Sequence, residues 1–66
     1  MNRLQIMRKE AGLSQSELAK KSGVSVRLIQ AYEQGLKDIN KGQVVTVLEL
    51  AEALGCDVYE ILNDRA

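Results

Sequence analysis

Hydrophobic residues recur every three to four positions along most of this chain, which is the spacing of an amphipathic α-helix. Leu4, Met7 and Ala11 share one face of a first segment that ends at about residue 11. A longer stripe predicts another helix over roughly residues 41–54. The stripe consists of Val44, Val47, Leu48, Ala51 and Leu54. Because no stretch alternates with period two for long enough to be a strand, the sequence predicts an all-α fold.

Glycines divide the chain into five predicted helices. Each of four glycines follows a helical stretch, as expected of the residue that most readily closes a helix in the left-handed conformation. They are Gly12, Gly23, Gly35 and Gly55. The first helix ends near residue 11, and the next three cover about 15–21, 26–34 and 41–54. A short fifth helix ends near residue 62.

Polar residues with capping spacing support the predicted starts of four of these helices. In a capping box the first side chain accepts from a backbone amide three residues later, and the second side chain returns the bond. Three pairs have this spacing: Ser14 with Glu17, Asn40 with Gln43, and Asp57 with Glu60. Ser25 is placed to cap the third helix.

Length and composition indicate one small globular domain, 1–66. A chain of 66 residues buries only about 60 % of its unfolded surface, so its margin of stability is thin. The single cysteine, Cys56, cannot form an internal disulfide, and we interpret it as a small hydrophobic residue rather than a reactive thiol. The N-terminal residues contain no signal peptide or membrane-spanning run, so we expect a reduced, cytoplasmic setting and no membrane partner.

The charges are unevenly distributed although the formal net charge is zero. Residues 1–37 contain seven lysines and arginines and three glutamates, a net charge of +4. Residues 38–66 contain two basic and six acidic residues, a net charge of −4. This asymmetry indicates a basic working face suited to a nucleic acid. The alternative is that solvated helix surfaces happen to sort by sign, which is our interpretation of Lys20 and Lys21.

A very short turn between the second and third helices is the most informative feature. Only residues 22–25 separate them, so the two helices must cross steeply. Close approach requires a small residue at the crossing and a turn residue that tolerates positive φ. Ala19 and Gly23 meet these two requirements.

Several short motifs resemble the phage-repressor and Cro-like (XRE-type, lambda-repressor-like) helix-turn-helix family over nearly the whole chain. They are Gly12-Leu13-Ser14-Gln15, Glu17-Leu18-Ala19, Gly23-Val24-Ser25, Ile29, Tyr32-Glu33, Gly35 and Leu50-Ala51-Glu52-Ala53-Leu54-Gly55. The resemblance implies a compact five-helix domain that binds operator DNA, often as a dimer on a palindromic site. It also implies that the third helix enters the major groove.

The outward side of the third helix carries the residue types that read base edges. With 100° per residue, one side is apolar and the other side is polar or small. The polar side consists of Arg27, Gln30, Ala31 and Gln34, with Val26 at its border. Arginine can donate two bonds to guanine, glutamine can pair with adenine, and Val26 or Ala31 can meet a thymine methyl group. The alternative is a solvated helix face without a partner.

Contacts to the DNA backbone are predicted on both sides of this helix. Ser14 and Gln15 begin the second helix, whose free amides attract a phosphate, and in the family a glutamine at the position of Gln15 contacts the backbone. Ser25, Lys37 and Lys41 are further candidates. Such contacts fix the register of a protein on DNA without reading its sequence.

The resemblance also implies one internal ion pair and a dimer surface. Arg8 and Glu33 match positions that pair in some repressors, so we expect a brace between the first helix and the end of the third. Related domains dimerise through their last segment. Its candidates here are Val58, Tyr59, Ile61 and Leu62.

An enzyme is disfavoured by the available residues. The chain contains no histidine and one cysteine, and it has no metal-ligand cluster or phosphate-cradling glycine loop, so we expect neither a cofactor nor a metal. The main alternative function is a protein-interaction module, such as an antitoxin, whose acidic second half contacts a protein. A further alternative is that the chain is the first part of a larger sensor.

Overall fold

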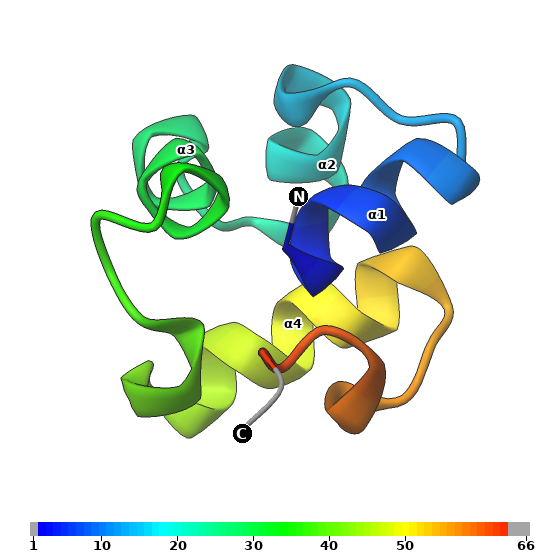
Figure 1. The fold of residues 1–66 in the computed structure, drawn as a ribbon. Coiled ribbons are helices and arrows are strands. Elements are labelled where there is room, and N and C mark those ends of the chain that lie inside the picture. Colours follow the sequence, from blue (N-terminus) through cyan, green and yellow to red (C-terminus); the bar gives the residue numbers. More distant parts are fainter. Residues whose placement is uncertain (1, 64–66) are drawn as a thin grey trace.

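A computed structural model describes residues 2–63, in which four α-helices surround one core (Figure 1). The helices are α1 (Arg3–Glu10), α2 (Gln15–Ser22), α3 (Val26–Gln34) and α4 (Val44–Leu54). Two 3-10 turns complete this part of the chain, η1 (Ile39–Lys41) before α4 and η2 (Val58–Glu60) after it. Residues 2–63 contain no strand, and the helices among them are too short or too polar to cross a membrane.

The expectation of a fifth α-helix is wrong. Between Gly55 and Asn63 the chain forms only η2, whose backbone bonds span three residues: Glu60 N–H donates to the Asp57 carbonyl at 3.0 Å, and Ile61 N–H donates to the Val58 carbonyl at 3.1 Å. The Glu60 carboxylate also accepts from Asp57 N–H at 2.9 Å. This last bond belongs to the predicted capping box, but the element that it begins is a single 3-10 turn of three residues.

The fourth helix begins three residues later than expected, because Asn40 does not cap it. The Asn40 amide instead forms two bonds with the backbone of Asn63, donating to its carbonyl at 3.1 Å and accepting from its N–H at 2.8 Å. Gln43 precedes the first residue of α4 and makes no capping bond with its side chain. The pairing of Asn40 with a residue 23 positions away has no signal in the local sequence.

The predicted caps of α2 and α3 are confirmed. Ser14 Oγ accepts from Glu17 N–H at 3.0 Å, and the Glu17 carboxylate accepts from Ser14 N–H at 2.8 Å. This backbone bond lowers the pKa of Glu17 below its ordinary value of 4.5. Ser25 Oγ accepts from Leu28 N–H at 3.2 Å. The helix-turn-helix unit therefore begins at two locally fixed points.

The short turn between α2 and α3 is also confirmed. Gly23 ends α2 with φ of +79°, a left-handed conformation that costs other residues about 1–2 kcal/mol. Ser22 Oγ accepts from the N–H of the buried Val24 at 3.1 Å, which satisfies a backbone donor inside the turn. Ala19 packs partly buried against the core at the crossing.

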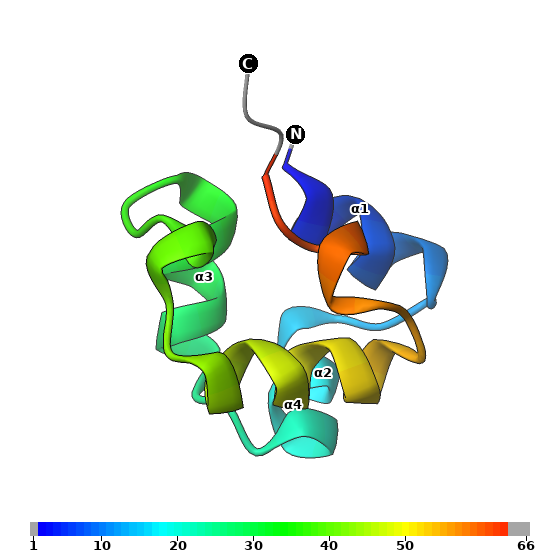
Figure 2. The ribbon, with the colours of Figure 1, turned by 90° about the horizontal axis from the view of Figure 1, so that it is seen from below.

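The core lies where the helices meet. Its six fully buried aliphatic side chains come from almost every element. They are Leu4, Leu18, Ile29, Ile39, Leu50 and Ile61. α4 packs against α2 and lies in front of it when the molecule is seen from below (Figure 2). Because Ile61 is 0 % exposed, its predicted place on a partner surface is wrong, and it belongs to the core of its own chain.

Candidate nucleic-acid interface

The outward side of α3 is open to solvent. Its predicted inner residues Ile29 and Tyr32 are buried, whereas Arg27 and Gln34 are exposed. Val26, Gln30 and Ala31 are partly exposed between them. Residues 2–63 therefore leave the polar side of this helix uncovered, and a partner can reach it.

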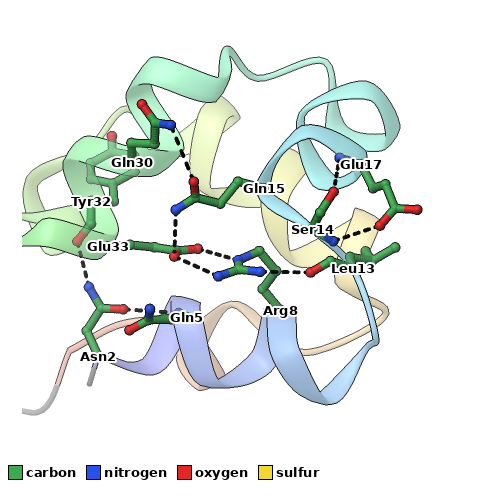
Figure 3. A network of polar contacts seen from close by, with 10 residues as sticks. All are labelled: Asn2, Gln5, Arg8, Leu13, Ser14, Gln15, Glu17, Gln30, Tyr32 and Glu33. Carbon is green, nitrogen blue, oxygen red and sulfur yellow. Dashed lines mark hydrogen bonds and ion pairs between the residues drawn. The ribbon is translucent and has the colours of Figure 1, made fainter.

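A network of polar side chains connects α3 to the two helices before it (Figure 3). Glu33, at the end of α3, accepts from Arg8 Nε at 2.7 Å and from Arg8 Nη2 at 3.0 Å. Gln15, the first residue of α2, donates to the same carboxylate at 3.0 Å. The amide of Gln30 in turn donates to Gln15 Oε1 at 3.4 Å. The network thus extends from α1 to a side chain on the outward side of α3.

The ion pair between Arg8 and Glu33, expected from the sequence, forms and is buried. The side chains are 10 % and 2 % exposed, respectively. The hydrogen bond to Glu33 raises the pKa of Arg8, and burial opposes part of that shift. Arg8 also donates to the Leu13 carbonyl at 2.8 Å, so the pair holds the loop between α1 and α2 as well. Two parallel bonds fix the relative orientation of α1 and α3 more narrowly than one bond would.

The start of α2 lies beside α3. Ser14 is exposed and Gln15 is partly exposed, but both side chains already have partners in the free protein. Sequence reasoning did not find the bonds of Gln15 to Glu33 and Gln30. These residues are 18 and 15 positions away on another helix, so only the crossing of α2 and α3 brings them together.

The connection from α3 to α4 supplies lysine side chains on the flank of α3 opposite Gln15. Lys37 and Lys41 are exposed and line the same depression, which also includes Tyr32 and the residues just before α4. Ser25, the remaining predicted backbone contact, is exposed at the start of α3. The predicted contacts therefore flank the outward side of α3 and do not form one cluster.

An apolar groove of about 180 Å³ adjoins this depression at Gly42 and lies between η1, the start of α4 and the last described residues. We call its surface residues Val44, Leu48, Val58 and Leu62 the apolar face. Val44 and Leu48 are exposed although they belong to the stripe that predicted α4. Val58 and Leu62 are partly buried against the core, and Tyr59 beside Val58 is 81 % exposed. Sequence periodicity missed the α4 part, because it cannot show which end of a helix the core covers.

Comparison with known proteins gives a consistent result. Residues 4–61 match the family model described as helix-turn-helix. The chain is also similar to the uncharacterized HTH-type transcriptional regulator y4dJ of Sinorhizobium fredii, with 36 % identity over 57 residues. This alignment covers 86 % of the present chain and 70 % of the relative. No solved structure matches the chain.

Replacing Arg8 with alanine should destabilise the fold by about 3 kcal/mol, because it leaves the buried Glu33 carboxylate without its cation. Thermal or denaturant unfolding of Arg8→Ala would measure this loss. The double variant Arg8→Leu/Glu33→Leu is the control, since removal of both charges should restore much of the stability. Unchanged unfolding combined with lost affinity for a ligand would contradict a bracing role and indicate direct contact by Arg8.

Proposed function

The chain belongs to the helix-turn-helix family, and we propose that it is a transcriptional regulator that binds double-stranded DNA sequence-specifically. One observation carries this proposal: the polar side of α3 is uncovered while its position is fixed by a buried network. An uncovered helix on a rigid support is the element that fits a major groove. The activity needs no cofactor, metal or enzymatic step, and we propose that the protein acts in the cytoplasm, most simply as a repressor.

In this proposal Arg27 and Gln30 read bases. The Arg27 side chain is exposed and makes no hydrogen bond within residues 2–63, so its two parallel donors remain available for a guanine. Gln30 is oriented by Gln15 and can present its carbonyl oxygen and remaining amide proton to an adenine. Val26 and Ala31 lie on the same side of α3, where a thymine methyl group can contact them.

The network prepares Gln30 for this role. A free glutamine side chain loses rotamer freedom when it binds, and a side chain already held by a hydrogen bond loses less. Gln15 is held in turn by Glu33 at 3.0 Å. We therefore propose that Gln15 couples backbone contact to base contact, because the same side chain lies at the start of α2 and touches Gln30.

The phosphate contacts proposed from the sequence remain compatible with the positions of the residues. Ser14, Gln15 and Ser25 lie at the starts of α2 and α3, and Lys37 and Lys41 lie at the connection to α4. The capping box of Ser14 and Glu17 already occupies one amide of α2. The Gln15 side-chain amide donates one proton to Glu33 and keeps its second proton for a phosphate.

We also propose that two copies of the chain pair through their apolar faces and bind a palindromic operator as a dimer. Exposed apolar side chains that line one groove on a small domain are typical of a contact surface. Val58, Tyr59 and Leu62 were expected in such a surface, and Val44 and Leu48 extend it onto α4. Ile61 is not part of this surface, because it is fully buried.

A protein-interaction module is the second candidate function, and the same apolar groove is the observation that favours it. On the exposed side of α4, Glu49 and Glu52 follow the apolar residues, so a partner with basic and apolar side chains would fit there. In that case the outward side of α3 would have no role.

A salt titration distinguishes these two functions. For the wild-type protein, the logarithm of the DNA association constant should fall linearly with the logarithm of salt concentration, by about 0.9 for each phosphate neutralised. Lys37→Gln should reduce this slope by about 0.9. Lys21→Gln is the matched control, because Lys21 lies exposed at the far end of α2 and should leave the slope unchanged. Absent or salt-independent DNA binding would favour the protein-interaction module.

Arg27→Ala should relax the preference for one base pair in each half-site, at a cost of about 1–3 kcal/mol on the preferred sequence. Selection of bound sites from random duplexes, performed with both proteins, measures this change. Equal weakening on every sequence would instead make Arg27 a phosphate contact.

Leu48→Asp should shift the protein from dimer to monomer in sedimentation, because it introduces a charge into the apolar face. Leu48 is 50 % exposed, so the monomer should still fold. Leu36→Ser, which changes an exposed leucine in the connection to η1, should leave the dimer intact. A wild-type protein that stays monomeric at high concentration and on DNA would refute the proposed dimer.

A further inference from the structure

The side chain of Asn2 connects the start of α1 to the end of α3 (Figure 3). Its amide group donates to the Tyr32 carbonyl at 2.6 Å, and its oxygen accepts from the Gln5 N–H at 3.0 Å. The bond to Gln5 caps α1, as the residue before a helix commonly does. The bond to Tyr32 reaches a residue 30 positions away and has no part in capping α1.

The Tyr32 carbonyl lies in the last turn of α3, where carbonyls no longer meet donors of their own helix. The chain after α3 supplies one donor, the Gly35 N–H, at a distance of 3.3 Å. The Asn2 amide is therefore the closer of the two partners. An asparagine suits this place, because its amide can donate to one helix end while its oxygen accepts from the other. The partial charges agree as well, since the negative end of α3 meets the positive start of α1.

The helix α1 holds the last turn of α3 at two points. Arg8, near the end of α1, pairs with Glu33, and Asn2 at its start binds the neighbouring Tyr32. The two positions on α1 are six residues apart, which is about 9 Å along the helix axis. A single tie would allow α3 to pivot about it. Two ties this far apart fix the angle between the helices more narrowly.

Contacts with bases would be sensitive to this angle. Arg27 lies six residues before Glu33, so it is about 9 Å along α3 from the tied turn. A pivot of about 10° would move Arg27 by roughly 1.5 Å, whereas groups that form specific bonds must be placed within about 0.5 Å. A lysine on a phosphate tolerates such a shift, because its flexible stem adjusts. Loss of the second tie should therefore weaken base reading more than contact with the DNA backbone.

We propose that Asn2 is a positioning residue for sequence recognition. By binding the Tyr32 carbonyl, it holds α3 at the angle at which the outward side of this helix meets base edges. This inference rests on the proposed function. In this role Asn2 acts through α3 and needs no contact with DNA of its own.

Asn2→Ser separates the two bonds, because serine caps a helix about as well as asparagine but its shorter side chain does not reach Tyr32. Affinity for the preferred duplex should fall about fivefold, as expected for one ordinary hydrogen bond. Affinity for a random-sequence duplex, and its salt slope, should not change, because the phosphate contacts remain. Asn2→Asp also keeps the cap but sets a carboxylate against the carbonyl, so it should lower the preference further.

Arg3→Met is the matched control. It removes a bond of the same kind, from the Arg3 side chain in α1 to the Glu60 carbonyl at 3.0 Å, but this bond does not involve α3. The ratio of the affinities for the preferred and random duplexes should therefore stay unchanged in Arg3→Met. All variants are compared at a temperature at which thermal unfolding shows them to be folded. An unchanged ratio in Asn2→Ser, or an equal loss on both duplexes, overturns the proposal.

Hydrogen exchange of backbone amides tests the tie without DNA. The amides of residues 35–37 donate to carbonyls in the last turn of α3. They should exchange several-fold faster in Asn2→Ser, whereas the Gln5 amide, whose cap is kept, should not. If exchange rises but no duplex binds, the tie to α3 stands, the DNA-binding function fails and the role in recognition falls with it. If duplexes bind specifically but Asn2→Ser changes neither exchange nor preference, the function stands and the positioning role is overturned.

Discussion

A buried carboxylate at the end of α3 ties this helix to the two helices before it. The Glu33 side chain is almost inaccessible to solvent and accepts two bonds from Arg8 of α1 and one from Gln15 of α2. A buried carboxylate is costly unless its charge is paired and its oxygens are hydrogen-bonded, so this group forces both partner helices into place. A domain of 66 residues has only a small apolar core. The two parallel bonds between Arg8 and Glu33 therefore add to apolar packing in fixing the orientation of α3.

The two flanks of α3 are built differently. At the start of α2 a side chain caps the helix, because Ser14 accepts from Glu17 N–H, and the Gln15 side chain is held by Glu33. At the start of α4 no side chain forms a cap, because the residue with the right spacing, Asn40, is used elsewhere. One flank therefore presents an oriented side chain, and the other presents an uncapped helix start with two lysines nearby. A partner that contacts both flanks can add bonds on one side without breaking bonds on the other.

The sequence predicted the parts that rest on local signals. The bounds of α2 and α3 follow from Ser14, Gly23 and Ser25, whose roles involve residues no more than four positions away. The pair of Arg8 and Glu33 came from a family resemblance, and the buried and open sides of α3 came from helical periodicity. The remaining features are non-local. The role of Asn40, the burial of Ile61 and the exposure of Val44 depend on where distant segments pack, and periodicity carries no such information.

The bonds between Asn40 and Asn63 join the two walls of the apolar groove. Asn40 belongs to η1 on one wall, and Asn63 directly follows Leu62 on the other. Neither wall can swing outward unless both bonds break together, and each bond satisfies a backbone group that would otherwise need water. Contacts within one chain therefore fix the width of the groove. A second molecule that docks there must fit a groove that is already formed.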